Sequence, residues 1–354
     1  MGNPGGFFLT EIARSLLVPS TQLIHLKRFF QSEAGALVCW VISSILFAAA
    51  ISPWVYQAGK AIAEMTAVAD LNGFLEWLGA SCERARFGRY FSRSLILAAV
   101  GLLPVLLWRL KRIRLQNGTT PDQTCNYSAR SALLQLGLGC AIAGSFLLAT
   151  GMIAGMLGAY LPLAVPAELG TVMLKILLLA ILVSLLEEWF FRGLLLGLWL
   201  KFAKPPVACV GASLLFAWVH FLEPSSASVL TGASSTLAGF KLVGEILQQF
   251  GHLRFLVTDF MPLFFIGLIL AWARVRTRSL WLPIGLHAGW ILALKGFTLT
   301  HLEVMNHPLQ PWILGSSLRS GLLPLAGLVV TAGACHLALR RVERAGLLVS
   351  HASR

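Results

Sequence analysis

The feature that most constrains the fold of this chain is a series of long apolar segments. Eight segments approach or exceed the ~20 residues that an α-helix needs to cross a bilayer. They lie at about 35–57, 92–108, 132–158, 173–199, 205–222, 259–275, 279–297 and 320–339. Backbone amides find no water in hydrocarbon, so a segment of this length must form its hydrogen bonds internally, as a helix does. The sequence therefore predicts an all-α, multi-pass transmembrane helical bundle of about eight spans.

The composition agrees with a membrane protein and argues against a nucleic-acid partner. Of the 354 residues, 57% are hydrophobic and 12% are charged, whereas a soluble domain has roughly a quarter of its residues charged. The net charge is +13, but the basic residues cluster beside the apolar segments, which is typical of membrane topology signals. Placing both termini in the cytoplasm puts most Lys and Arg on the cytoplasmic side, although the arginine cluster at 84–93 opposes this N-in/C-in orientation.

The chain is expected to have four regions. Residues 1–34 are a cytoplasmic tail, in which 7–17 form either an amphipathic helix on the membrane surface or part of a partly ordered tail. Residues 35–160 hold about three spans, 161–300 hold spans four to seven, and 301–354 hold the last span and a basic cytoplasmic tail. Two long connections, 58–91 and 223–258, are interpreted as loops, and helical spacing within the second is compatible with a short interfacial or re-entrant helix.

Three charged residues lie inside the fourth predicted span, in LLEEWFFRGLLLG (185–197). A charge at the centre of a bilayer costs about 2.5–3.5 kcal/mol even on the gentler insertion scales, and such residues are functional-site candidates. On a helix, Glu188 and Arg192 are four positions apart and can pair, whereas Glu187 points about 100° away. Taken alone, this pattern fits an ion pair that locks two helices together as well as it fits a catalytic site.

Two histidines in later spans favour catalysis. His220 ends FAWVH (216–220), and His287 lies in SLWLPIGLHAGW (279–290). A single intramembrane histidine usually only bonds one helix to another, but two of them with a pair of glutamates suit general acid–base chemistry. Counting ~1.5 Å per residue from the span ends places His220 several ångströms nearer the outside than Glu187. We nevertheless expect the three side chains to share one cavity.

The order of these motifs resembles a known family. EEWFFR (187–192) fits E-E-x-x-x-R, FAWVH (216–220) fits F-x-x-x-H, and FFIGLIL (264–270) precedes RTRSLWLPIGLHAGW (276–290). The pattern resembles the CPBP family of intramembrane proteases, which includes the type II CAAX prenyl endopeptidases, over about 173–297. The resemblance makes 161–300 a protease core and implies an intramembrane endopeptidase of the bacterial cytoplasmic membrane. Its substrate would be a membrane-associated protein or peptide, lipidated or anchored near its C-terminus.

The resemblance also implies a role for each candidate residue. Glu187 would activate the attacking water with help from His220, Glu188 and Arg192 would brace the site, and His287 would bind the developing oxyanion. We expect no cofactor, because no H-E-x-x-H motif accompanies these residues. The alternative is a zinc site, with Glu187, His220 and His287 as three ligands of an open catalytic metal.

One position departs from the family pattern. The last motif usually carries Asn or Asp four residues after its histidine, but this chain has Ile291. Isoleucine can neither donate a hydrogen bond nor bind a metal, which favours reduced activity or a non-catalytic membrane scaffold or bacteriocin-immunity protein as the alternative function. An ion- or proton-coupled transporter would also explain buried charges, but its usual internal repeat is not visible in this sequence.

Overall fold

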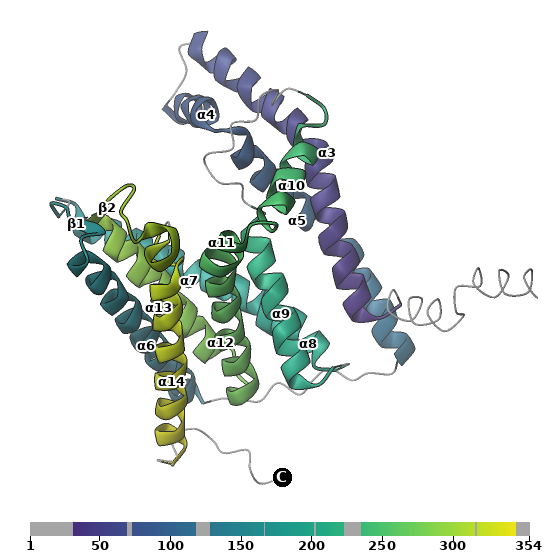
Figure 1. Cartoon of the computed structure of the whole chain (residues 1–354). Coiled ribbons are helices and arrows are strands. Elements are labelled where there is room, and N and C mark those ends of the chain that lie inside the picture. The colour runs from purple at the N-terminus through teal and green to yellow at the C-terminus, as the bar shows by residue number, and fades with distance from the viewer. Residues whose placement is uncertain are drawn as a thin grey trace, which may run out of the picture. The chain divides into compact units, whose positions relative to one another are not determined.

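The computed structural model describes most of the chain as helix (Figure 1). The described residues are 31–68, 73–117, 128–165, 167–201, 203–222, 235–315 and 317–344. The predicted surface helix at 7–17 and the basic tail after residue 344 lie outside them. Contacts divide the chain into two compact units, Met1–Asp122 with Leu230–Phe240, and Gln123–Val229 with Lys241–Arg354.

Among the described residues, seven helical stretches are long and apolar enough to cross a membrane. They are Gly35–Val68, Phe87–Ile113, Ala129–Met156, Leu169–Trp199, Leu253–Thr277, Trp281–Thr300 and Leu322–Arg344. The remaining predicted span is the shorter apolar helix Pro205–His220. The prediction of an all-α multi-pass membrane bundle is confirmed.

The described part of the first unit contains α3 (Glu33–Val68), α4 (Gly73–Arg84) and α5 (Phe87–Asn117), together with the first residues of a later helix. The Lys60 ammonium of α3 lies 2.6 Å from the carbonyl oxygen of Glu83, so it satisfies the end of α4. The interpretation of 58–91 as a loop was wrong, because helix occupies most of that segment. A helix makes its own backbone hydrogen bonds and can continue beyond the apolar run that predicted it.

The second unit contains the third to eighth predicted spans. Its elements before the gap at 223–234 are α6 (Ala129–Met156), β1 (Tyr160–Pro162), α7 (Leu169–Glu188), the π-helix η1 (Trp189–Leu195), α8 (Leu196–Trp199) and α9 (Pro205–His220). After that gap come α10 (Ala238–Gln249, which begins in the first unit), α11 (Leu253–Phe255), the π-helix η2 (Leu256–Phe260), α12 (Met261–Thr277), α13 (Trp281–Thr300), β2 (His301–Glu303), the π-helix η3 (Gln310–Leu314) and α14 (Leu322–Arg344). The connection 223–258 was interpreted as a loop, with a short helix as the alternative, and the described part of it contains α10, so the loop interpretation was wrong there. The predicted boundaries of the protease core, at residues 160 and 300, stay a prediction. Helix α6 contacts α13 and α14, and α12 contacts the same two helices, so the helices on both sides of the predicted core pack with it (Figure 1).

Helix α13 packs backbone to backbone against α6. A Cβ atom at Gly285 would lie 2.2 Å from the carbonyl oxygen of Leu136, and one at Gly289 would lie 2.5 Å from that of Cys140. Small residues four apart permit this close approach between membrane helices. His287 lies midway between the two glycines, about 200° around the helix from each, so the face opposite α6 carries the histidine. The antiparallel pair β1–β2 joins the segment after α6 to the end of α13, with Tyr160 opposite Glu303.

Candidate active site

The helix that carries the E-E-x-x-x-R motif changes its winding inside the motif. Glu187 and Glu188 are the last residues of α7, and Trp189–Leu195, which includes Arg192, forms a π-helix. Such wide turns inside α-helices often lie at functional sites. The spacing of the sequence gave no sign of this turn, since Glu188 and Arg192 were expected to pair on an ordinary α-helix.

Glu188 and Arg192 form a completely buried ion pair. The Nη1 atom of Arg192 lies 2.7 Å from Oε1 of Glu188, and the two side chains are 2% and 0% exposed. The other terminal nitrogen donates to the carbonyl oxygen of Gly267 at 3.3 Å, and the guanidinium lies 4.3 Å from the ring centroid of Phe216. The predicted pairing is present. Three different helices therefore hold the arginine in place.

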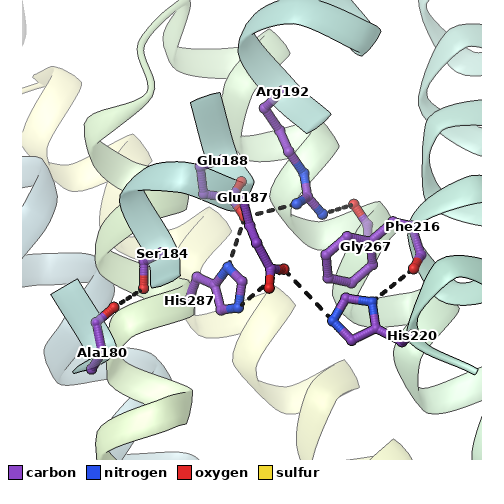
Figure 2. Close-up of polar contacts among 9 residues, drawn as sticks. All are labelled: Ala180, Ser184, Glu187, Glu188, Arg192, Phe216, His220, Gly267 and His287. Atoms are coloured by element: carbon purple, nitrogen blue, oxygen red, sulfur yellow. Dashed lines mark hydrogen bonds and ion pairs between the residues drawn. The ribbon is translucent and has the colours of Figure 1, made fainter. Parts of the chain in front are cut away.

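His287 extends this network toward the second glutamate. Its Nδ1 atom lies 2.8 Å from Oε1 of Glu188, the same oxygen that accepts from Arg192 (Figure 2). Its Nε2 atom faces Glu187, 4.0 Å from Oε2. A carboxylate at Glu188 requires a proton on Nδ1, and so the second ring nitrogen is directed at the carboxylate that Arg192 does not neutralise.

His220 approaches Glu187 from another helix. Its Nδ1 atom lies 2.8 Å from the carbonyl oxygen of Phe216, and because a carbonyl only accepts, Nδ1 carries a proton. In the neutral ring the Nε2 atom is then a lone-pair acceptor, 3.6 Å from Oε2 of Glu187. The depth estimate that separated these residues was wrong, because α9 has only 16 residues, and its ends need not align with those of the longer spans.

Of the two adjacent glutamates, Glu187 is the one that is accessible from the space around it. Figure 2 shows its side chain pointing between the rings of His220 and His287. Its side chain is 30% exposed, and its Oε2 atom makes no hydrogen bond within the described part of the chain. Adjacent carboxylates in such different surroundings can take different roles.

These groups line a single cavity of about 290 Å³. Its wall is mostly apolar and comes from α6, α7, α9, α12, α13, α14 and the segment before α14. The ionisable residues in the wall are Glu187, His220, His287, Lys295 and Arg319. The expectation that Glu187 and the two histidines share a cavity holds, whereas Glu188 and Arg192 lie behind the wall.

Ile291 lines the same cavity, one helical turn after His287. Its side chain offers no donor or ligand atom there, as the sequence indicated. Three contributors were missed: the carbonyl of Gly267, Lys295 and Arg319. Lys295 could have been found, because it follows Ile291 by four residues on the same helix. A backbone acceptor such as Gly267 has no signal in a single sequence.

The choice between no cofactor and a zinc ion stays a prediction. Over the described ranges, no group of three or more His, Cys, Asp or Glu side chains is arranged to hold a metal ion. No step below depends on a metal.

The comparison with known families agrees with this geometry. Residues 169–293 match the family model described as type II CAAX prenyl endopeptidase Rce1-like. This segment, about a third of the chain, is similar to the Rce1-like domain. The domain begins at the first residue of α7, ends in α13, and contains all five candidate residues, which confirms the resemblance to the CPBP intramembrane proteases. The Rce1-like family implies protease activity.

No curated protein and no solved structure matches the chain. Helix α6, Lys295, Arg319 and α14 contribute to the cavity from outside the Rce1-like domain.

Proposed function

We propose that this membrane protein is an endopeptidase in which Glu187 activates a water molecule to hydrolyse a peptide bond of a membrane-associated substrate. The observation that carries the proposal is the division of work between adjacent glutamates. The Glu188 carboxylate contacts Arg192 and His287, whereas the Glu187 carboxylate faces two imidazoles in a cavity. A carboxylate with a histidine within a few ångströms is suited to general base catalysis.

The separations leave room for the nucleophile. Oε2 of Glu187 is 3.6 Å from one Nε2 atom and 4.0 Å from the other, which is beyond direct hydrogen-bond distance but suits groups that share a water. In the proposed step the water oxygen attacks the carbonyl carbon of the scissile bond while its proton passes to Glu187. His220, with its free Nε2 lone pair, assists as base, and the proton then moves to the departing amine.

His287 is the proposed donor to the tetrahedral intermediate. With Nδ1 donating to Glu188, its Nε2 atom can donate only if the ring is an imidazolium. The carboxylate of Glu188 stabilises that cation, and Arg192 in turn neutralises the carboxylate that both contact. Ile291 supplies no second donor, so the oxyanion is less well stabilised than it would be with an amide at this position.

The substrate must present its peptide bond at membrane depth. The cavity wall is largely apolar, which suits an extended apolar segment or a lipid-anchored peptide more than a polar one. The type II CAAX prenyl endopeptidases are named for prenylated CAAX sequences, whose cysteine lies close to the C-terminus. We therefore propose a substrate that is lipidated or anchored near its C-terminus. The N-in/C-in orientation stays a prediction.

The test is hydrolysis of prenylated CAAX peptides by the full chain in liposomes. Glu187→Gln and His220→Gln should each lower kcat by about 10²–10⁴-fold, since each removes a proton acceptor. Glu343→Gln is the matched control, because Glu343 pairs with Arg276 on the surface, and it should leave kcat unchanged. Normal turnover by Glu187→Gln would refute the mechanism. We also expect full activity after treatment with a metal chelator.

A further inference from the structure

Two arginines near the start of α5 form no ion pair with any residue that the structure describes. Arg89 and Arg93 are both exposed, and they lie four positions apart on this helix. Side chains at that spacing are neighbours on one face, with about 5–6 Å between their Cβ atoms, and like charges there repel each other. An anion that contacts both guanidinium groups would remove the repulsion and accept charge-assisted hydrogen bonds from each.

The face of α5 that carries the two arginines continues as an apolar surface. Ile96, Leu97 and Val100 are exposed, and each lies within about 80° of Arg89 around the helix axis. The change from basic to apolar runs along the axis, with about 10 Å between Arg93 and Val100. A phospholipid has its groups in the same order, since an anionic phosphate is followed by acyl chains.

The guanidinium of Arg93 has a fixed support. It lies 5.9 Å from the ring centroid of Tyr90, and Tyr90 is buried. The Tyr90 hydroxyl donates to the carbonyl oxygen of Cys82 at 2.9 Å, and a Cβ atom at Gly59 of α3 would overlap the Tyr90 ring. An arginine placed over an aromatic ring keeps the edge of its planar guanidinium available for a bidentate contact with a phosphate.

The preceding helix, α4, has on its outer face the side chains that are typical of a membrane interface. Gly79 packs against α3, where a Cβ atom would overlap Thr66. Phe74, Trp77 and Arg84 point about 140–160° away from Gly79, and all three are exposed. The two aromatic rings stack with their centroids 6.1 Å apart. Aromatic and basic residues on one face favour a position at the level of the lipid headgroups.

Basic residues beside a membrane helix often only set its topology or extend to water. A topology signal acts through charge and needs no fixed geometry, whereas the guanidinium of Arg93 lies over a buried ring. The arginine cluster at 84–93 also opposes the orientation that the other basic residues favour. A headgroup site accounts for the cluster on either side of the membrane.

We propose that Arg89 and Arg93 bind the phosphate of one anionic phospholipid of the bilayer, whose acyl chains lie on Ile96, Leu97 and Val100. The inference goes beyond the proposed function, because its ligand is a lipid that is not a substrate. The site lies in the first compact unit and outside the matched Rce1-like segment.

The experiment measures lipid binding by the purified full chain in a neutral detergent, using native mass spectrometry. Phosphatidylglycerol and phosphatidylcholine are the two probes, and one phosphatidylglycerol should bind with a Kd about 10–100-fold lower. Arg89→Gln and Arg93→Gln should each reduce this preference, and the double Gln variant should abolish it. Replacing both arginines by lysine keeps the charges but loses the planar contacts, so it should preserve only part of the preference.

Lys175→Gln is the matched control. Lys175 is exposed on α7 and has no other cation within four residues, so its loss should leave the preference unchanged. Because Arg89 and Arg93 are exposed, their variants should unfold at the same temperature as the unmodified chain in lipid-free detergent. This measurement separates loss of the site from loss of the fold.

Equal affinity for the two lipids would overturn the inference, and so would a preference that survives in the double Gln variant. If the double Lys variant binds phosphatidylglycerol as tightly as the unmodified chain, charge alone attracts the lipid and the proposed geometry is wrong. If inorganic phosphate displaces the lipid at equal concentration, the site takes free phosphate and the inference is also refuted.

Discussion

Removing the charge of Arg192 should destabilise the protein more than any surface charge substitution. In Arg192→Met the carboxylate of Glu188 stays 0% exposed but loses its 2.7 Å partner, and the arginine's contacts with Gly267 and Phe216 are lost as well. Leaving one charge of a buried pair uncompensated typically costs about 3–5 kcal/mol. Arg192→Lys keeps the charge but loses the planar contacts, so we expect about 1–3 kcal/mol.

A double-mutant cycle tests whether the pair acts as a unit. Glu188→Gln alone leaves Arg192 buried without a counter-charge and should cost a similar amount. The double variant Glu188→Gln/Arg192→Met removes both charges, so its loss of unfolding free energy should be smaller than the sum of the two single losses by at least about 2 kcal/mol. The cycle thereby measures the interaction rather than the damage caused by each substitution.

The assay is reversible unfolding in mixed micelles, followed by tryptophan fluorescence. Arg276→Met is the matched control, since Arg276 and Glu343 form an equally short pair at 2.6 Å but are 44% and 33% exposed. An exposed pair contributes about 0–1 kcal/mol. If Arg192→Met costs no more than the control, or if the two single losses simply add, then the buried pair does not brace the site.

Three further predictions follow from other positions. Gly289→Leu should lower stability strongly and abolish activity, because a Cβ there would lie 2.5 Å from a backbone carbonyl of α6; Gly296→Ala, whose nearest contact is at 3.9 Å, should be tolerated in the same thermal unfolding assay. Ile291→Asn should raise the single-turnover rate constant by up to about 10²–10³-fold, the contribution of one oxyanion donor. An unchanged rate constant would exclude this position from transition-state binding. Burial raises the pKa of Glu303 despite a hydrogen bond from Gln310, so its protonated form contributes stability that is complete below the ordinary glutamate pKa and lost as pH rises through the raised value. Glu303→Gln should remove this pH dependence, which is measured as the free energy of unfolding at a series of pH values above the ordinary glutamate pKa.

The spans could be predicted because apolar length is a local property. A run of about 20 apolar residues has to be a helix in a bilayer whatever surrounds it. The helix at 73–84 was missed for the same reason, since it is short, carries Glu76 and Arg84, and needs no apolar run to form. The π-helix after Glu188 was missed because it keeps the same residues in the same order and changes only the backbone bonding.

In the candidate site, too, the contacts within one helix could be predicted more directly than the contacts between helices. The pairing of Glu188 with Arg192 is a consequence of spacing within one helix, and so the sequence predicts it. The meeting of Glu187 with His220 and His287 depends on three helices, and motif order indicated it where depth counting failed. Arg319 approaches the cavity from a non-helical segment, so no periodicity could have placed it there.

The phase difference between Glu187 and Glu188 connects stability to chemistry. Adjacent residues on a helix point about 100° apart, which is enough to direct the Glu188 carboxylate into the protein interior and the Glu187 carboxylate into the cavity. Because Glu188 is neutralised, it can hold His287 without competing for the proton that the reaction moves. Inserting one alanine before Glu187 would turn Glu187 to the inward position and leave the alanine facing the cavity. Peptide hydrolysis should then be abolished even if an ion pair with Arg192 re-forms, since no carboxylate would face His220.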